Sequence, residues 1–322
     1  MIILYIEERV IHLLEIINLS KAFKQNKVVN GINLHLEKGE TVGLLGPNGA
    51  GKSTSISLIS SLIQPDGGDV RLNNESIIKS PQNLRKILGV VPQEIALYMD
   101  LSARENLIFF GKMHKIPNSK LQTRVEEVLD IIGLTDRQKD LVKTFSGGMK
   151  RRLNIGVALL HEPEIIIMDE PTVGIDPQSR NYILETVKRL NKEQKMTVLY
   201  TSHYMEEVEF LCNRIYIMDH GEIIASGTKE EIKNILSAET AINIKVELVK
   251  NEFIEALRKE SNVRHLSVHQ STISVIVPRQ VNMLKDIFRH AESNGTTVLS
   301  VQIETPSLED VFLHLTGRQL RD

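Results

Sequence analysis

The chain lacks several features that mark whole classes of protein. Its 322 residues include one cysteine and no tryptophan, and its formal net charge is −2. A single cysteine, Cys212, excludes an intramolecular disulfide and a cysteine-based zinc cluster, so we expect a buried apolar side chain in a reducing compartment. The nearly balanced charge gives no basic surface for bulk nucleic-acid binding, and no nucleic-acid partner is expected. No apolar run reaches the roughly 18 residues of a membrane span.

The composition is otherwise that of an ordinary globular protein. Charged residues make up 25% and hydrophobic residues 41% of a chain long enough for one large domain and a small one. Residues 1–13 are apolar but contain Glu7, Glu8 and Arg9. They lack a basic start and a small-residue cleavage site, so they are not typical of a secretion signal. We predict that they form an N-terminal extension.

The strongest motif lies within residues 41–56, where an apolar strand enters a glycine-rich turn and continues into a helix. It fits the G-x-x-x-x-G-K-[ST] phosphate-binding loop. The glycines let backbone N–H groups point inward, and the helix start presents further N–H groups to the same anion. A lysine adds charge for the β- and γ-phosphates, and a serine hydroxyl suits Mg²⁺. A glycine-rich turn without a ligand is the weaker alternative. The predicted loop consists of Gly46, Pro47, Asn48, Gly49, Ala50, Gly51, Lys52, Ser53 and Thr54.

A second motif is an apolar strand at 165–168 that ends in two adjacent carboxylates, Asp169 and Glu170. Side-chain alternation along a strand sends these carboxylates in different directions. Asp169 can hold Mg²⁺, directly or through water, and Glu170 can reach a water that attacks the γ-phosphate. An acidic turn after a core strand is the alternative, and the phosphate-binding loop elsewhere in the chain makes it the weaker interpretation.

A third motif, Ser146-Gly147-Gly148, opens another predicted helix. Ser146 is a natural N-cap, and the two glycines expose backbone N–H groups. Basic residues at 150–152 then crowd a helix start, where the dipole disfavours cations, and a nearby anion would offset that conflict. Taken alone, the motif is better explained as an ordinary capped turn. With the first motif, it gives the chain two helix starts suited to phosphate.

Three single residues carry weaker signals. Gln93 follows a short predicted strand and could contact Mg²⁺ or the attacking water. His203 follows the strand at 196–200 and could donate to the γ-phosphate, although a lone histidine is usually structural. Phe23 could stack on adenine or belong to the core.

The order of strands and helices predicts a doubly wound α/β fold. Residues 14–237 form the predicted large domain, with a helical subdomain at about 94–162 that a Ser102–Glu105 capping box introduces. Residues 238–322 have the order β-α-β-β-α-β-α, which predicts a ferredoxin-like α+β domain. The expected strands of the large domain span 14–19, 28–36, 41–45, 88–91, 165–168, 196–200 and 214–218, and those of the small domain span 242–249, 263–269, 272–277 and 298–304.

Together these motifs resemble the ATP-binding subunit of ABC transporters over residues 14 to about 235. The order of the motifs makes the resemblance specific: an aromatic residue, Walker A, Q-loop, signature, Walker B, D-loop and switch histidine. The resemblance implies a P-loop NTPase of the ABC type, with a RecA-like core, an antiparallel β subdomain and a helical subdomain. The motifs are represented here by Phe23, Gly46–Thr54, Gln93, Ser146–Met149, Asp169 with Glu170, Asp176 and His203.

The resemblance also implies roles for these residues. ATP and Mg²⁺ are the expected cofactors, and Ser53, Gln93 and Asp169 are the expected metal ligands. Glu170, His203 and Gln93 are the expected catalytic residues. The loop at 46–54, Phe23, Ser146, Gly147, Gly148 and Asp176 are expected to bind nucleotide.

The family further implies two protein partners. One is a second ATPase, identical or paralogous, in a head-to-tail dimer where each signature helix faces the ATP held by the other subunit. The other is a separate integral membrane permease, which implies a peripheral location at the cytoplasmic face of the membrane. The helical subdomain docks the permease after the Q-loop, so Leu97, Tyr98 and Met99 are candidate contacts, with local core packing as an equal alternative.

Where the motifs differ from the commonest sequence of the family, they resemble one branch of that family. The signature is Phe-Ser-Gly-Gly-Met at 145–149, and Gly174-Ile175 precede the D-loop Asp176. With the tail at 307–313, these features resemble bacterial drug and antibiotic exporters such as daunorubicin-resistance ATPases. ATP hydrolysis would then power export of a drug, antibiotic or lipid-like compound. Family members begin near Leu14, so residues 1–12 are expected to be a misassigned start, with initiation at Leu13.

Two other functions remain open on the sequence. A non-transport ABC ATPase could act on ribosomes or DNA, but this chain has one ATPase unit and no sustained heptads in the roughly 100 residues between Walker A and the signature. An importer ATPase with a regulatory tail is the other alternative.

Overall fold

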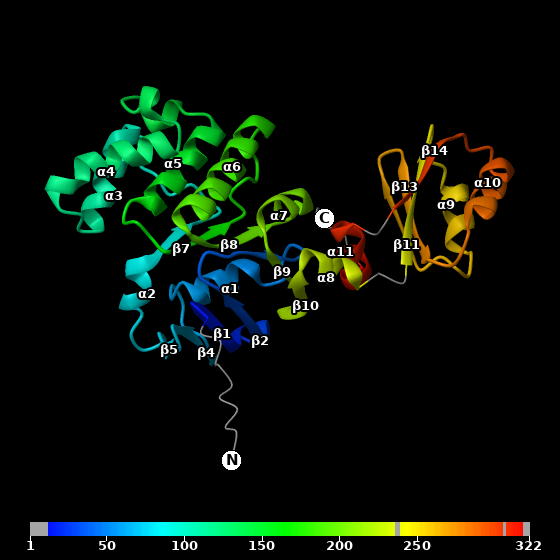
Figure 1. Ribbon diagram of the computed structural model, residues 1–322, viewed down its shortest axis with the longest axis horizontal. Helices are drawn as coiled ribbons and strands as arrows, with labels where there is room; N and C mark the ends of the chain where they lie inside the picture. Colours follow the sequence, from blue (N-terminus) through cyan, green and yellow to red (C-terminus); the bar gives the residue numbers. More distant parts are fainter. Residues whose placement is uncertain (1–11, 236–238, 305–306, 318–322) are drawn as a thin grey trace, which may run out of the picture. The chain divides into compact units, whose positions relative to one another are not determined.

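The computed structural model describes residues 12–235, 239–304 and 307–317, so nearly all of the predicted extension lies outside the described residues (Figure 1). The chain divides into two compact units between Ser226 and Gly227. The second unit begins before the predicted boundary at residue 238, because helix α8 (Lys229–Asn234) packs on helix α11 (Leu308–Thr316). No helix in the described ranges is long and apolar enough to cross a membrane.

A six-stranded sheet in the order β10-β9-β3-β8-β7-β6 forms the centre of the first unit. Its strands from β9 to β6 are parallel to their neighbours, as expected from strand–helix alternation. Every residue of β3 and β7 is buried, which explains their nearly continuous apolar sequences. The strands are β3 (Thr41–Leu45), β6 (Leu88–Val91), β7 (Ile165–Asp169), β8 (Thr197–Ser202), β9 (Arg214–Asp219) and β10 (Glu222–Thr228).

An antiparallel sheet in the order β2-β1-β4-β5 completes the core of this unit. One apolar cluster joins Ile16 of this sheet, Leu44 and Ile167 of the parallel sheet, and Ile56 of helix α1 (Lys52–Ile59). Strands β4, β5 and β10 were not predicted, because their half-exposed residues give a weak apolar pattern. The strands of the second sheet are β1 (Leu14–Phe23), β2 (Asn26–Leu36), β4 (Gly67–Leu72) and β5 (Glu75–Ser76).

The predicted helical subdomain contains three helices that lie together in Figure 1. Its first helix begins at the predicted capping box, because Ser102 Oγ accepts from the N–H of Glu105 and a carboxylate oxygen of Glu105 accepts from the N–H of Ser102. The next ends near Gly133, whose φ of +61° suits glycine. The helices are α3 (Ala103–Met113), α4 (Asn118–Ile131) and α5 (Gly147–Leu159). Outside this subdomain lie α2 (Gln82–Ile87), α6 (Pro177–Gln194) and α7 (Met205–Leu211).

The second unit contains an antiparallel sheet in the order β12-β13-β11-β14, which is the strand order of a ferredoxin-like domain. Ile242 and Ile244 lie opposite Val275 and Ile273 and form a core with helices α9 and α10. The elements are β11 (Glu239–Val246), α9 (Asn251–Arg258), β12 (His265–His269), β13 (Thr272–Pro278), α10 (Leu284–Ser293) and β14 (Val298–Glu304). Helix α11 begins at the predicted Ser307 cap.

Candidate functional site

The glycine-rich loop joins β3 to α1 through close backbone contacts. A Cβ atom at Gly46 would lie 2.4 Å from the carbonyl oxygen of Met218, and one at Gly51 would lie 2.6 Å from that of Val28. Gly51 also has a φ of +107° at the N-cap of α1. Only glycine fits both positions without displacing backbone. The turn ends at the first N–H groups of α1, which are suited to bind an anion.

Lys52, at the start of α1, is buried. Its Nζ donates to the carbonyl oxygens of Gly46 and Pro47 at 2.8 and 3.2 Å, and lies 3.4 Å from Oε1 of Glu170. A buried ammonium is costly unless it has such partners. Lys52 therefore connects the loop to the end of β7, so the structure brings together two motifs that are far apart in the sequence.

Glu170 follows β7 with a φ of +46°, in the left-handed region that few non-glycine residues adopt. Its buried carboxylate has Oε2 at 3.1 Å from Nδ1 of His203 and at 3.5 Å from Nε2 of Gln93. The hydrogen bond with His203 is the largest influence on the pKa of Glu170 and lowers it; burial opposes this effect, and the charge of Lys52 supports it. The carboxylate is therefore ionised at neutral pH.

Asp169, the last residue of β7, lies opposite Thr201 on β8. The Thr201 hydroxyl donates to Oδ1 of Asp169 at 2.8 Å and accepts from the N–H of Glu170 at 2.9 Å. Thr201 was assigned no role from the sequence, and its position two residues before His203 was the available signal. Ser53 lies in the first turn of α1 and is exposed. The carboxylate of Asp169, the hydroxyl of Ser53 and the amide of Gln93 are oxygen donors that fit Mg²⁺.

Gln93 is held by a residue whose role the sequence analysis missed. The buried Arg151 donates from Nη1 to the carbonyl oxygen of Pro92 at 2.8 Å and from Nη2 to that of Gln93 at 2.6 Å. Arg152 donates to the carbonyl oxygen of Gly133. Backbone carbonyl oxygens therefore accept hydrogen bonds from both of these guanidinium groups, so Arg151 and Arg152 do not support the suggestion that an anion explains the basic run at 150–152.

Four further predicted residues lie around the starts of α5 and α6. Ser146 caps α5 by accepting from a backbone N–H in its first turn, and both Ser146 and Gly147 are exposed. Gly148 is buried, and a Cβ atom there would lie 2.0 Å from Oγ of Ser179. Asp176 caps α6 by accepting from the N–H of Ser179 at 2.8 Å, and this bond is the main cause of its lowered pKa. The start of α5 thus packs against the first turn of α6.

Comparison with known proteins decides the family. A model of the ABC transporter family matches residues 29–173, and a model of the ATP-binding protein DrrA1-3-like C-terminal domain matches residues 227–316. The linearmycin resistance ATP-binding protein LnrL of Bacillus subtilis (strain 168) is 50% identical over 307 residues, covering 95% of this chain and 98% of that protein. The chain belongs to the ATP-binding proteins of ABC transporters.

Further relatives of this ABC ATPase agree. The daunorubicin resistance ATP-binding protein DrrA3 of Streptomyces coeruleorubidus is 33% identical, covering 94% of this chain and 95% of that protein. The Nod factor export ATP-binding protein I of Cupriavidus pinatubonensis (strain JMP 134 / LMG 1197) is 36% identical, covering 96% of this chain and 92% of that protein. A dimeric post-hydrolysis structure of the ATP-binding cassette MJ0796 bound to ADP and Pi is similar at a TM-score of 0.61 and 28% identity, covering 67% of this chain and 98% of that one.

These relatives confirm the family and the exporter branch that the sequence motifs predicted. The chain is an ATP-binding and ATP-hydrolysing subunit of an ABC exporter. The relatives favour neither the non-transport ATPase nor the importer. The fold prediction is also confirmed, since the similar structures are ABC cassettes and the second unit has the ferredoxin-like strand order.

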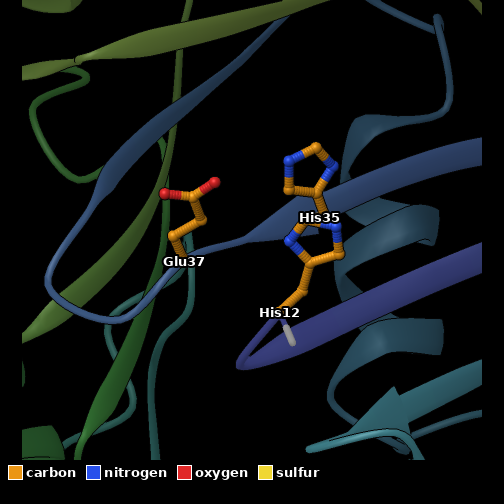
Figure 2. Close-up of side chains that lie close together, drawn as sticks. All are labelled: His12, His35 and Glu37. Atoms are coloured by element: carbon orange, nitrogen blue, oxygen red, sulfur yellow. The ribbon is translucent and has the colours of Figure 1, made fainter. Parts of the chain in front are cut away.

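Another cluster of this ABC ATPase could supply metal ligands. His12, His35 and Glu37 have ligand atoms within 4.8 Å of one another (Figure 2). The two imidazole rings pack against each other in a tilted arrangement, with centroids 3.9 Å apart and 31° between their planes. Arg214 also contacts the His35 ring, and burial with its charge lowers the pKa of His35. We interpret the cluster as structural packing.

Proposed function

We propose that the ABC exporter subunit binds ATP at residues 46–54 and hydrolyses it with Glu170 as the catalytic carboxylate. The observation that carries this proposal is the convergence of three side chains on Glu170. Lys52, His203 and Gln93 come from separate segments, and their nitrogen atoms lie 3.4, 3.1 and 3.5 Å from its carboxylate oxygens. A charged loop, a carboxylate and two hydrogen-bonding side chains are among the parts that phosphoryl transfer to water uses.

Each residue has a chemical task in this proposal. Lys52 stabilises negative charge on the β- and γ-phosphates. Glu170 accepts a hydrogen bond from the attacking water and orients it in line with the γ-phosphate, a role that suits an ionised carboxylate. His203 donates to the γ-phosphate and holds the Glu170 carboxylate in place. Gln93 contacts the same water.

Ser53, Gln93 and Asp169 are the residues that would hold Mg²⁺. Their oxygen donors fit this ion, and the Thr201 hydroxyl fixes the Asp169 carboxylate. When bound, the ion would neutralise charge on the phosphates. The side chains themselves supply the ligands and their orientation.

A second ATPase, identical or paralogous, would complete the site. We propose that Ser146, Gly147, Gly148 and Asp176 contact the nucleotide held by that partner. The exposure of Ser146 and Gly147 at the start of α5 supports this assignment, because a helix start is suited to bind phosphate. Phe23, which is 48% exposed, would stack on adenine.

The proposed second partner is a membrane permease, which would hold the subunit at the cytoplasmic face of the membrane. Leu97, Tyr98 and Met99 are the proposed contacts. Tyr98 is 49% exposed and packs edge-on against Phe109 with ring centroids 4.7 Å apart, which supports an aromatic docking surface. The cargo would be a drug, an antibiotic or a lipid-like compound.

The substitution Glu170→Gln tests the catalytic assignment. It keeps the shape of the side chain and removes its charge, so we expect kcat for ATP hydrolysis to fall roughly 100- to 10,000-fold. ATP binding should persist, and gel filtration with ATP should show an accumulated dimer. Glu164→Gln changes an exposed carboxylate in the same way and is the control. ATP turnover of Glu170→Gln at the parental rate would refute the assignment.

Lys52→Ala tests the phosphate-binding role separately. Removing the ammonium should weaken ATP binding or turnover at least tenfold, as measured by fluorescent nucleotide titration and phosphate release. Lys38→Ala, at an exposed lysine, is the matched control. Equal affinity and turnover in Lys52→Ala and the parent would contradict the assigned role.

A further inference from the structure

Glu207 on α7 is a buried carboxylate outside the proposed catalytic group. It is 1% exposed, and its Oε2 accepts hydrogen bonds from three hydroxyl groups. The donors are Thr172 Oγ1 at 2.9 Å, the Tyr200 hydroxyl at 2.9 Å and Ser202 Oγ at 2.7 Å. Burying a charge is costly unless it is well partnered, so three donors on one oxygen indicate that this carboxylate has a specific task.

The other carboxylate oxygen faces a different part of the chain. Oε1 of Glu207 lies 3.4 Å from Nε of Arg180, in the first turn of α6. The Arg180 guanidinium stacks on the Tyr204 ring at 4.2 Å from its centroid, and that ring packs against His203 with centroids 4.5 Å apart. Arg180 is thus connected to His203 by two chains of contacts. One runs through Glu207 to Ser202, which precedes the histidine, and the other runs through the Tyr204 ring.

The partners of Glu207 adjoin the proposed catalytic residues. Thr172 comes two residues after Glu170, and Ser202 immediately precedes His203. Ser202 Oγ also accepts from the N–H of Tyr204 at 2.9 Å, which fixes the turn that carries the histidine. One carboxylate therefore holds the segments on both sides of the Glu170–His203 hydrogen bond and the start of α6.

We propose that Glu207 is a positioning residue for ATP hydrolysis, which sets the geometry of His203 against Glu170 and couples it to the start of α6. The inference rests on the proposed roles of Glu170 and His203. A displacement of about 1 Å can cost roughly 100-fold in rate, so small shifts of this network matter. Asp176 caps α6 and is proposed to face the partner ATPase. The network therefore also connects the proposed dimer contact at the start of α6 to His203.

The first experiment measures steady-state ATP hydrolysis by the full-length chain. Glu207→Gln removes the charge with little change in shape, and we expect kcat to fall roughly 10- to 100-fold while KM for ATP changes less than about twofold. Glu206→Gln makes the same change at the adjacent, exposed carboxylate and serves as the control. A Glu207→Gln enzyme with kcat within about twofold of the parent would overturn the proposal.

A double-mutant cycle separates positioning from a general structural role. If Glu207 acts through His203, the Glu207→Gln change should have little further effect on kcat in a His203→Ala background. If the two substitutions lower kcat independently, so that their fold losses multiply in the double variant, the proposal is overturned. Parental activity in His203→Ala alone would instead refute the proposed role of His203, so the two failures are distinguishable.

A second pair of variants keeps the test valid if Glu207→Gln does not fold. Thr172→Val removes one hydroxyl donor at nearly constant volume, and Thr172→Ser keeps it. Positioning predicts that kcat falls in Thr172→Val and recovers in Thr172→Ser, with KM nearly constant in both. Equal activity of the two variants would contradict a role for the hydrogen bond to Glu207.

Discussion

Lowering the pH should destabilise the ABC ATPase through one histidine, His161. Its ring stacks on that of His114 with centroids 4.2 Å apart and planes within 6°. Nε2 donates to the carbonyl oxygen of Leu88 at 3.0 Å, whereas Nδ1 is buried with no hydrogen-bond partner among the described residues. Burial, followed by the charge of His114, lowers the pKa of His161 to about 4.

The sign and size of the effect follow from proton linkage. An unfolded histidine titrates near about 6.5, so between that pH and about 4 the unfolded chain binds a proton that the folded chain does not. The stability that neutral His161 contributes is complete above this window and is lost as the pH falls through it. The full shift corresponds to about 2 kcal/mol between pH 7 and pH 5, and partial solvent exposure reduces this to about 1 kcal/mol.

Urea unfolding of the full chain at pH 7 and pH 5 measures this effect, with His161→Gln as the comparison. Glutamine can still donate to the Leu88 carbonyl oxygen but does not titrate. We expect the parent to lose about 1 kcal/mol more than the variant on acidification. The exposed His220→Gln should behave like the parent. Equal losses in the parent and His161→Gln would refute the reasoning.

Two further substitutions test contacts that position the site. Arg151→Lys replaces two guanidinium hydrogen bonds to the backbone at Gln93 with a single ammonium, and we expect kcat to fall roughly tenfold with KM for ATP nearly constant; an unchanged kcat would show that this support is dispensable. Gly148→Ala brings a Cβ atom within 2.0 Å of Ser179 Oγ, so thermal unfolding should show a loss of about 1–3 kcal/mol. Adding Ser179→Gly should restore most of it, and failure to do so would argue against the proposed clash.

The sequence predicted those parts of the molecule that depend on local patterns. The loop at 46–54, the Ser102 and Ser307 helix starts and the ferredoxin-like strand order each follow from residue types within short segments. The sequence also indicated Glu170 and His203 as chemically capable residues. It could not show that Lys52 and His203 both contact the Glu170 carboxylate, because that requires the register of separate strands.

The residues that the sequence analysis missed act through long-range contacts. The Thr201 hydroxyl hydrogen-bonds to both Asp169 and Glu170 only because β8 lies beside β7. Arg151 was grouped with its basic neighbours, although its partners are carbonyl oxygens about 60 residues earlier in the chain. Glu207 is one of two adjacent glutamates, and only burial distinguishes it from the exposed Glu206. Side-chain chemistry identifies candidate functional residues, and only the tertiary structure shows which partners each of them contacts.

The division of the chain between Ser226 and Gly227 determines how its accessory part can be removed. A truncation at residue 237, where the sequence alone would place it, would keep α8 and discard α11. Helix α8, which carries the fully buried Ile232, would then lose the helix that packs on it, and the shortened protein would tend to aggregate for reasons unrelated to transport. Deletions meant to reveal what the C-terminal unit contributes should therefore remove α8 and α11 together.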